Sequence, residues 1–440
     1  MAIKKENIME ILIDWNLWGN FSPNFKPREE YLKKINSFLK TGQILVINGV
    51  RRAGKSALTY LTVMDLIKKG HLKKENALFI NFEDPRLPID LEIKDIIKIY
   101  EIYLEELKPT GQIIVVLDEI QRVKAWERVA RFFLENKNLK VIVTGSSSKL
   151  LSQEYATVLT GRHIDLEIFP LSFQEFLQFK NLKLRGKLDI LRERVKIKQM
   201  LTGFVNYGGF PKVILEKEKE KLLETYFNDI IVKDVVQRFK IKEMGKLTEL
   251  ARWYVTNIST VQSFNKIKNY FKLSLDSVER FSSYFDLARL CIFVPKFSYS
   301  PKSLALSPKK VYIIDQGFFK VLGFNFSQNL GRIYENIVGL EILRFYKKEI
   351  FYWKNSGHEV DFVVKEGLKI TRLIQVCYNI ENPEVKKREI RALLRASQEL
   401  SCRDLLVITE DYQAEEKVIW RKMSSMIKFI PLWKWLLNNG

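Results

Sequence analysis

The pattern of hydrophobic and polar positions divides the first part of the chain into buried strands and amphipathic helices. Continuous apolar runs at residues 43–48, 112–119 and 139–147 are typical of strands buried on both faces of a parallel sheet, and a further strand is predicted at 163–168. Residues 57–69 have the apolar spacing of an amphipathic helix. The alternation of predicted strands and helices along this part of the chain predicts an α/β domain.

After residue 180 the pattern becomes mainly helical and then mixed. Residues 217–239 predict a long amphipathic helix, which follows a charged helical segment and a turn at 207–211. The further predicted elements are helices at 245–259, 263–273, 274–290 and 332–346, strands at 289–297, 309–315 and 370–380, and a hairpin at 350–367. The domains predicted from these patterns are 1–180, 181–244, 245–325 and 326–440.

Residues 49–56, GVRRAGKS, form the strongest chemical motif of the chain. They fit the pattern G-x-x-x-x-G-K-[ST] between a predicted strand and a predicted helix, which is the context of a phosphate-binding P-loop. Backbone N–H groups and the helix N-terminus then converge on an anion, Lys55 reaches the phosphates and Ser56 binds Mg²⁺. The predicted nucleotide-binding residues are Gly49, Val50, Arg51, Arg52, Ala53, Gly54, Lys55, Ser56 and Ala57.

Two carboxylates end the apolar run 112–119 and predict the second half of a nucleotide site. Asp118 would hold Mg²⁺ through water, and Glu119 would polarise the attacking water. Glu119 favours hydrolysis over nucleotide binding alone.

Two further side chains are candidates for the same chemistry. Ser146 follows the run at 139–147 and would contact the γ-phosphate or the lytic water; a simple turn after the strand is the alternative. Arg162 precedes the strand at 163–168 and would act as an arginine finger in its own or a neighbouring subunit; a surface ion pair is the alternative.

The motifs GVRRAGKS, VVLDEIQ with Trp126 after it, VTGSS, and LTGR followed by PLSFQEF occur in this order over about the first 175 residues. In these features the chain resembles the archaeal-type P-loop ATPases related to AAA+ and STAND proteins. The resemblance implies a five-strand parallel core, ATP or ADP as the ligand, and a helical lid and linker at 181–244. It also implies that Arg51 and Arg52 add positive charge beside the phosphates or contact a partner subunit.

Three helices followed by a hairpin at 245–325 are the elements of a winged helix. Its third helix has Ser274 as the predicted N-cap and Asp276 in its first turn. That helix has more acidic than basic side chains, so we expect phosphate contacts from the hairpin more than base recognition by the helix. Packing against protein is the alternative. The candidates for DNA contact are Arg280, Lys296, Lys302, Lys309 and Lys310.

The C-terminal pattern of helix, hairpin and apolar strand resembles a restriction-endonuclease-like PD-(D/E)xK domain. Glu335 matches the helix acid of that family and Asp361 its metal-binding Asp. Gln375 and Cys377 stand where the family has an acid and a Lys, and neither side chain replaces the lost metal ligand or cation. The resemblance therefore implies a nuclease-like fold without nuclease activity.

Composition and charge limit the class of protein. The net charge is +21, and residues 181–330 alone hold 27 basic and 14 acidic side chains, which favours a nucleic-acid partner. No apolar run is long enough to span a membrane and no signal peptide is recognised, so we expect a soluble cytoplasmic protein. Cys291, Cys377 and Cys402 suggest neither disulfides nor a zinc site.

The sequence therefore predicts a Mg²⁺-dependent ATPase that acts as a nucleotide-controlled switch or motor on DNA. An ATP-gated nuclease and a regulatory ATPase that acts on a protein partner are the alternatives. The sequence leaves open whether the chain forms a homo-oligomer.

Overall fold

A computed structural model describes residues 4–88, 90–136, 138–146, 159, 161–323, 330–345, 349–420 and 423–438. The chain forms two compact units, Met1–Phe169 and Pro170–Gly440. The boundary lies before the predicted one at residue 180, because helix α8 (Phe173–Phe179) packs with helices of the second unit. Ser147 and Thr160, which belong to the predicted motifs, lie outside the described residues.

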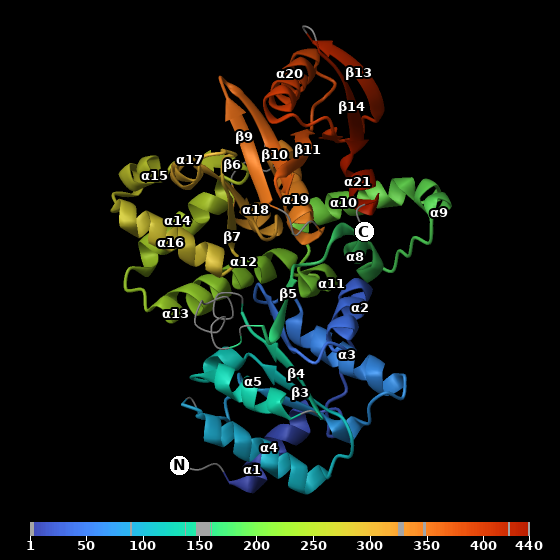
Figure 1. The fold of residues 1–440 in the computed structure, drawn as a ribbon, viewed down its shortest axis with the longest axis vertical. Helices are drawn as coiled ribbons and strands as arrows, with labels where there is room; N and C mark the ends of the chain where they lie inside the picture. Colours follow the sequence, from blue (N-terminus) through green and yellow to red (C-terminus); the bar gives the residue numbers. More distant parts are fainter. Residues whose placement is uncertain are drawn as a thin grey trace. The chain divides into compact units, whose positions relative to one another are not determined.

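The first unit is built on a parallel sheet with the strand order β2-β3-β4-β1-β5 (Figure 1). The four predicted strands are confirmed, whereas the sequence analysis did not place β2, a short apolar run directly after a charged segment. The strands are β1 (Ile44–Gly49), β2 (Ala77–Asn81), β3 (Ile113–Asp118), β4 (Leu139–Thr144) and β5 (His163–Ile168).

Helices cover both faces of this sheet (Figure 1). One face packs against α1 (Lys5–Trp15), α4 (Ile93–Leu107) and α5 (Trp126–Glu135), with alternate strand side chains such as Val46, Val115 and Val143 in the shared core. The other face packs against α3 (Lys55–Lys68), which in turn contacts α2 (Glu29–Phe38). Two short 3₁₀ helices, η1 (Lys74–Asn76) and η2 (Ile120–Arg122), complete the unit.

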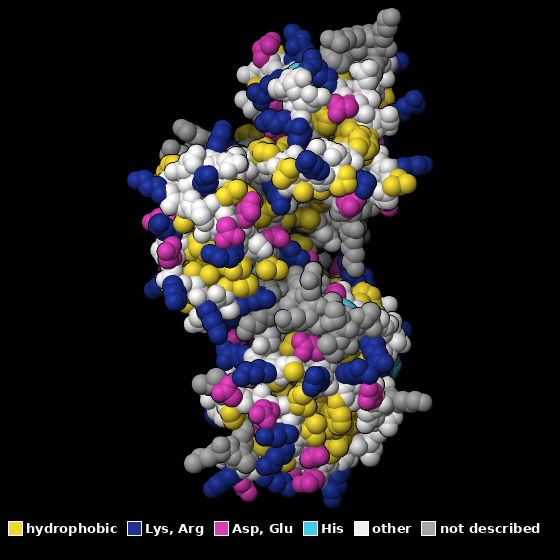
Figure 2. Space-filling view, turned by 60° about the vertical axis from the view of Figure 1, so that its left-hand side comes forward, with side chains coloured by type: hydrophobic (Ala, Val, Ile, Leu, Met, Phe, Trp, Pro, Cys, Tyr) yellow, Lys and Arg dark blue, Asp and Glu magenta, His cyan; other side chains and the backbone are white. Residues whose placement is uncertain are grey.

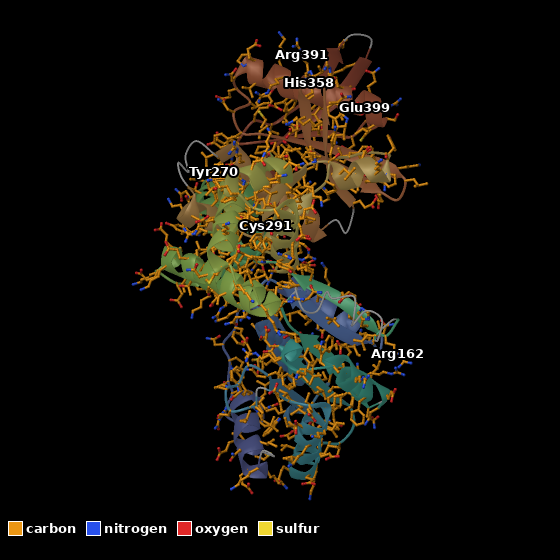
Figure 3. All side chains as sticks on the ribbon, turned by 90° about the vertical axis from the view of Figure 1, so that its left-hand side faces the viewer. Arg162, Tyr270, Cys291, His358, Arg391 and Glu399 are labelled. Carbon is orange, nitrogen blue, oxygen red and sulfur yellow. The ribbon has the colours of Figure 1, made fainter. Side chains whose placement is uncertain are left out.

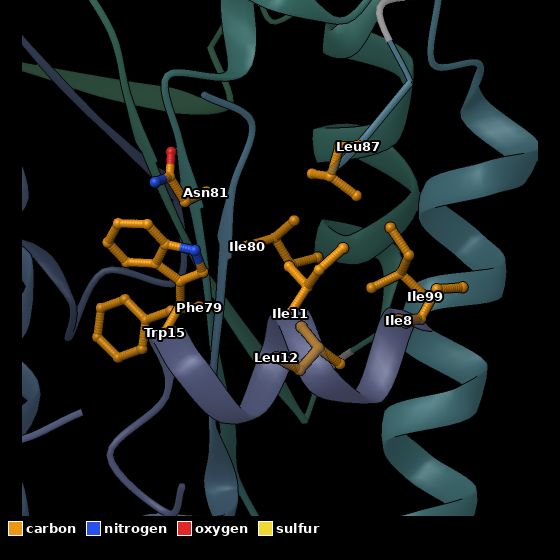
Figure 4. A pocket seen from close by; sticks show the side chains of 9 residues that line it. All are labelled: Ile8, Ile11, Leu12, Trp15, Phe79, Ile80, Asn81, Leu87 and Ile99. Carbon is orange, nitrogen blue, oxygen red and sulfur yellow. The ribbon is translucent and has the colours of Figure 1, made fainter. Parts of the chain in front are cut away.

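Helix α1 protects the edge of the sheet at β2. Its side chains Ile8, Ile11 and Leu12 line a small apolar cavity against β2 and α4 (Figure 4). Directly after the helix, the buried Asn16 amide pairs with the main chain of Phe79: Asn16 Nδ2 donates to Phe79 O at 2.9 Å, and Phe79 N donates to Asn16 Oδ1 at 2.7 Å. The amide thereby provides hydrogen-bond partners for the main-chain N–H and C=O of Phe79 at the open edge of the sheet.

The second unit begins with helices, as predicted for residues 181–244. The long helix predicted at 217–239 is confirmed and contains one π-helical stretch. The elements are α9 (Lys187–Arg192), α10 (Arg194–Tyr207), α11 (Pro211–Leu215), α12 (Lys219–Asp229), the π-helix η3 (Ile230–Val236) and α13 (Gln237–Phe239).

Three helices and a three-stranded antiparallel sheet follow. The sheet has the order β6-β8-β7, and its first strand, β6, was not predicted because it is only three residues long. Ser274 is confirmed as an N-cap, since its hydroxyl accepts a hydrogen bond from Ser277 N at 3.0 Å. The elements are α14 (Met244–Thr256), β6 (Thr260–Gln262), α15 (Phe264–Phe271), α16 (Leu275–Leu287), β7 (Cys291–Val294), α17 (Pro301–Leu306), β8 (Lys309–Ile313) and α18 (Gly317–Leu322).

The C-terminal part of the unit contains a six-stranded mixed sheet with the order β13-β14-β12-β11-β10-β9. The predicted hairpin at 350–367 is confirmed as β9 and β10, and α20 shares an apolar core with one face of the sheet. The elements are α19 (Leu330–Phe345), β9 (Glu349–Asn355), β10 (His358–Glu366), β11 (Lys369–Cys377), α20 (Pro383–Leu400), β12 (Leu405–Thr409), β13 (Ala414–Trp420), β14 (Met423–Pro431) and α21 (Leu432–Asn438).

A buried carboxylate fastens the predicted turn at 207–211 to the region after β8. Asp315 accepts hydrogen bonds from Gly209 N at 2.7 Å and from Gly317 N at 2.8 Å, and burial raises the pKa of its carboxyl to about 7. Gly208 has a φ of +72°, and a Cβ at this position would lie 1.6 Å from Asp315 Oδ1. The turn therefore requires glycine for both its backbone conformation and its space.

We predict that Gly208→Ala destabilises the protein by about 2 kcal/mol or more, because it combines a strained backbone with a collision against a buried carboxylate. Gly245→Ala is the matched control, since no atom lies within 4 Å of a Cβ there and the position lies in helix α14. Chemical denaturation of both variants measures the difference. Equal stabilities would show that the turn adapts without cost.

Candidate nucleotide site and C-terminal carboxylate cluster

The loop between β1 and α3 has the backbone of a phosphate-binding turn. Gly49 has a φ of +147°, and a Cβ there would lie 2.2 Å from Ile168 O on the neighbouring strand. Gly54 is the N-cap of α3 with a φ of +96°, and Arg52 also has a positive φ of +70°. These left-handed residues turn the loop tightly around the N-terminus of α3, where free N–H groups attract an anion.

Lys55 lies beneath this loop and is 5% exposed. Its ammonium donates to Gly49 O at 3.2 Å and to Val50 O at 3.3 Å, and lies 4.0 Å from Glu119 Oε1. A buried ammonium with three donors needs such acceptors. The position beside the loop carbonyls is one from which the Lys55 ammonium can donate to phosphate oxygens held by the loop.

Side chains from two other elements, Ser56 of α3 and Thr144 of β4, meet at Asp118 of β3. The Ser56 hydroxyl lies 2.9 Å from both carboxylate oxygens of Asp118, and the Thr144 hydroxyl donates to Asp118 Oδ1. Burial and the neighbouring Glu119 raise the pKa of the Asp118 carboxyl to about 6. A hydroxyl and a carboxylate within hydrogen-bonding distance are hard oxygen donors of the kind that Mg²⁺ binds together with phosphate, so this pair fits the predicted metal.

Glu119 is held in an unusual backbone conformation beside this pair. Its φ is +54°, its N–H donates to Thr144 Oγ1 at 3.2 Å, and its carboxylate accepts a hydrogen bond from Gln121 Nε2. Thr144 therefore contacts both acids, through the side chain of Asp118 and the main chain of Glu119. The sequence analysis did not identify Thr144, although its place at the end of β4, beside β3, would have been a usable signal.

Two arginines, Arg28 outside the loop and Arg51 within it, form contacts around the loop. The buried Arg28 donates through Nη1 to Ala53 O at 3.1 Å and to Phe169 O at 2.9 Å, so that it ties the loop to the end of the first unit. Arg51 lies 3.4 Å from Glu83. Arg28 was not predicted, because it lies 21 positions before the P-loop and no motif marks it.

The two further candidates of the nucleotide site have different surroundings. Ser146 is buried just after β4, the strand that lies between β1 and β3 in the sheet. Arg162 is exposed just before β5 (Figure 3), and its main-chain carbonyl accepts a hydrogen bond from Ile44 N at 3.0 Å. The sensor role of Ser146 and the finger role of Arg162 stay predictions.

In the second unit, the structure brings Glu335 and Asp361 together around a lysine. Lys310 Nζ lies 2.8 Å from Glu335 Oε1, 2.8 Å from Asp361 Oδ1 and 2.8 Å from Glu359 Oε1, and the Lys310 side chain is 1% exposed. The prediction that Lys310 contacts DNA is therefore wrong. Alternation along β8 places Lys310 and Tyr312 on one face, and both donate to Glu335.

Gln375 belongs to the same cluster, whereas Cys377 does not act as a polar group. Gln375 Oε1 accepts a hydrogen bond from Asp361 N at 3.3 Å, and its Nε2 donates to Glu389 Oε2 at 2.7 Å. Cys377 packs in the core between the sheet and α20, and burial raises the pKa of its thiol to about 12. In the described part of the chain, no group of three acidic, His or Cys side chains has the geometry to hold a metal ion.

The remaining candidates for DNA contact are at least partly accessible. Lys302 is exposed, Lys296 and Lys309 are half-buried, and Arg280 forms a 3.5 Å ion pair with Asp276 on its own helix. These four residues stay predictions as DNA contacts.

Helix α20 carries a second basic surface that the sequence analysis missed. Lys387, Arg388, Arg391 and Arg395 recur at helical spacing, and we call them the α20 basic stripe. Figure 2 shows Lys and Arg side chains gathered over the upper part of the second unit, and Figure 3 shows Arg391 beside His358. Burial and the charges of Arg395 and Arg391 lower the pKa of His358. The spacing was visible in the sequence and would have identified the stripe.

Three family models match successive segments of the chain. Residues 41–177 match the AAA domain family, residues 198–328 match a domain of unknown function (DUF8612), and residues 330–434 match another domain of unknown function (DUF4143). The match to the AAA domain agrees with the P-loop, the order of the parallel strands and the Ser56–Asp118 pair. The first unit is therefore an AAA-type P-loop ATPase domain. None of the helices in the described residues is long and apolar enough to cross a membrane.

Relatives cover nearly the whole chain. The uncharacterized protein MJ1544 of Methanocaldococcus jannaschii is 36% identical over 92% of this chain and 91% of its own length. An uncharacterized protein of Haemophilus influenzae is 30% identical over 80% of this chain and 87% of its own length. A solved Walker-type ATPase of Pyrococcus abyssi is 13% identical, with a TM-score of 0.45 over 69% of this chain and 99% of that one. The chain thus belongs to the family of MJ1544, with an AAA-type P-loop domain at its N-terminus.

Proposed function

We propose that the protein is a Mg²⁺-dependent ATPase whose nucleotide state controls the binding of DNA by its second unit. The observation that carries the enzymatic part is the meeting of Lys55, Ser56 and Asp118 at the end of the parallel sheet, with Glu119 within 4.0 Å of the Lys55 ammonium. Ser56 and Asp118 would hold Mg²⁺, which would supply neutralisation of the phosphate charge.

The residues of the chain have separate tasks in this proposal. The loop N–H groups and Lys55 hold the phosphates, and the Glu119 carboxylate accepts the proton of the attacking water. Thr144 orients both acids through its hydroxyl. Ser146 senses the γ-phosphate, and Arg162 supplies positive charge in its own or a neighbouring subunit.

Three features support DNA as the partner. Residues 181–330 hold an excess of 13 positive charges over negative ones. Apart from the short helix α17 between β7 and β8, the order α14-β6-α15-α16-β7-β8, with β8 between β6 and β7 in the sheet, is the order of elements in a winged helix. The α20 basic stripe adds further basic side chains, of which Lys387, Arg388 and Arg391 are exposed and can contact phosphates.

A protein partner is the second candidate, and one observation favours it. Leu188, Leu191 and Val195 are 70%, 67% and 71% exposed and recur at helical spacing across α9 and the start of α10. Exposed apolar side chains in such a row are typical of a protein-binding surface.

We predict that Glu119→Gln retains ATP binding and loses hydrolysis by at least ~100-fold, because the amide cannot accept a proton. Lys55→Ala should lose turnover as well, through the loss of phosphate contacts. Equilibrium binding of a fluorescent ATP analogue and a phosphate-release assay separate the two effects. Turnover by Glu119→Gln at the wild-type rate would show that another group accepts the proton.

Thr144→Val should reduce turnover by about tenfold or more, because it removes the hydroxyl that orients both acids while keeping the shape of the side chain. Thr144→Ser is the matched control and should stay near the wild-type rate. A phosphate-release assay at saturating ATP gives the comparison. Equal rates for the Val and Ser variants would exclude a role of this hydroxyl in hydrolysis.

For the DNA part, we predict that Glu119→Gln binds duplex DNA with an affinity that differs at least about fivefold between saturating ATP and ADP. The double variant Lys387→Gln with Arg391→Gln should weaken that binding. The slope of the logarithm of affinity against the logarithm of salt concentration should fall by the equivalent of one to two phosphate contacts at most. The double variant Lys33→Gln with Lys94→Gln removes the same charge from exposed positions of the first unit and is the control. Fluorescence anisotropy over a range of salt concentrations measures both effects. Affinity that is indifferent to nucleotide would favour the protein partner.

A further inference from the structure

The carboxylate cluster of the C-terminal domain has the composition of a divalent cation site but holds a lysine. Glu335 comes from α19, and Glu359 and Asp361 come from β10, where a shift in the register with β9 falls between Val360 and Val363. Each of the three carboxylates places one oxygen 2.8 Å from Lys310 Nζ. Carboxylate oxygens are the ligands that Mg²⁺, Mn²⁺ and Ca²⁺ prefer, but at 2.8 Å from their common centre these three are spaced for an ammonium and not for a metal ion.

The lysine is fully used by these contacts. An ammonium has three N–H donors, and Lys310 has three carboxylate partners at equal distances. Burial alone would lower the pKa of Lys310, but the charges of Asp361 and Glu335 raise it well above the ordinary value, so the group stays charged. Burial and the neighbouring Asp361 also raise the pKa of Glu335 to about 8.

Two of the three remaining carboxylate oxygens of the cluster are engaged by other groups. Asp361 Oδ2 accepts a hydrogen bond from Val376 N at 2.9 Å, and Glu359 Oε2 lies 2.8 Å from Lys354 Nζ. The ammonium thus lies at the centre of the cluster, and the second oxygens of Asp361 and Glu359 are fixed by Val376 and Lys354. A metal ion and the Lys310 ammonium cannot both occupy this point.

Lys310 also comes from a different part of the chain than its partners. It belongs to β8, which lies in the region matched by one family, whereas the carboxylates lie in the region matched by the next. The same junction is held by Asn336, whose Oδ1 accepts from Ile313 N at 2.8 Å and whose Nδ2 donates to Ile313 O at 3.0 Å. Tyr352 adds a hydrogen bond from its hydroxyl to Pro308 O at 2.7 Å.

We propose that the Lys310 ammonium takes the place of a divalent cation in this carboxylate pocket, so that the pocket is closed to metal-dependent hydrolysis and instead fastens the C-terminal domain to β8. The inference goes beyond the proposed ATPase function and does not depend on it. It accounts for a nuclease-like set of acids in a domain that has Cys377 where the nuclease family has a lysine. The lysine is present, but it comes from a neighbouring strand and fills the position of the metal.

The test compares Lys310→Ala with Lys309→Ala, the neighbouring residue on the opposite face of β8. Both are made in an Asp118→Asn background and studied without nucleotide, so that the P-loop contributes no metal ligand. Binding of Mn²⁺ is measured by electron paramagnetic resonance, and unfolding midpoints are measured with Mn²⁺ and with a chelator. We expect Lys310→Ala to gain one Mn²⁺ and to be stabilised by it, whereas the parent and Lys309→Ala gain none.

A folded Lys310→Ala that gains no Mn²⁺ would overturn the proposal. Because Lys310→Ala leaves buried carboxylates without a cation, it can fail to fold, and Glu359→Gln on the same background provides a second test. Glu359 is partly exposed, and its substitution leaves Lys310 with two carboxylate partners. The proposal predicts equal Mn²⁺ binding by the parent and by Glu359→Gln. Loss of a bound Mn²⁺ in Glu359→Gln would show that the natural pocket holds metal and would overturn the proposal.

Discussion

The hydrogen bonds between Ser56 and Asp118 are the interaction on which the first unit depends for its chemistry. They join the start of α3 to the end of β3, two elements that are separated by 62 positions in the chain. The parallel sheet makes this meeting possible, because β1 and β3 end at the same edge with β4 between them. Thr144, at the end of β4, then bridges the two acids from the intervening strand.

Each unit contains a buried lysine, and the two lysines have different hydrogen-bond partners. Lys55 has two main-chain carbonyls as partners and a carboxylate at 4.0 Å, so its charge remains available to an anion at the loop. Lys310 has three carboxylates at 2.8 Å and therefore no donor left for a ligand. We propose that the same chemical group binds an anion in one case and fastens two parts of the chain together in the other. What differs is the number and charge of its partners.

The sequence predicted the parts of the fold that have local signals. The strands β1, β3 and β4 are continuous apolar runs, the P-loop has a motif, and Ser274 is an N-cap that the structure confirms. The strands β2 and β6 were missed because each is short and depends on its neighbours in the sheet for its conformation.

The site was predictable where its residues belong to recognisable motifs and not where only the contacts in the fold show their role. Lys55, Ser56, Asp118 and Glu119 were identified from motifs. Thr144 lies within the VTGSS motif and Arg28 lies in no motif, but the contacts through which both act are visible only in the fold. Lys310 was misassigned for the same reason. A lysine next to another lysine in a predicted hairpin suggests an exposed cation, but alternation along β8 turns one of the two into the interior, and only the position of Glu335 and Asp361 shows which.

We propose that ATP turnover in the first unit is coupled to DNA binding by the second unit. The most direct test is the rate of ATP hydrolysis by the full-length wild-type protein with Mg²⁺, measured with and without duplex or branched DNA. The account predicts that DNA changes the rate and that the change disappears at high salt, where phosphate contacts are weak. A rate that is the same with and without DNA at low salt would contradict it.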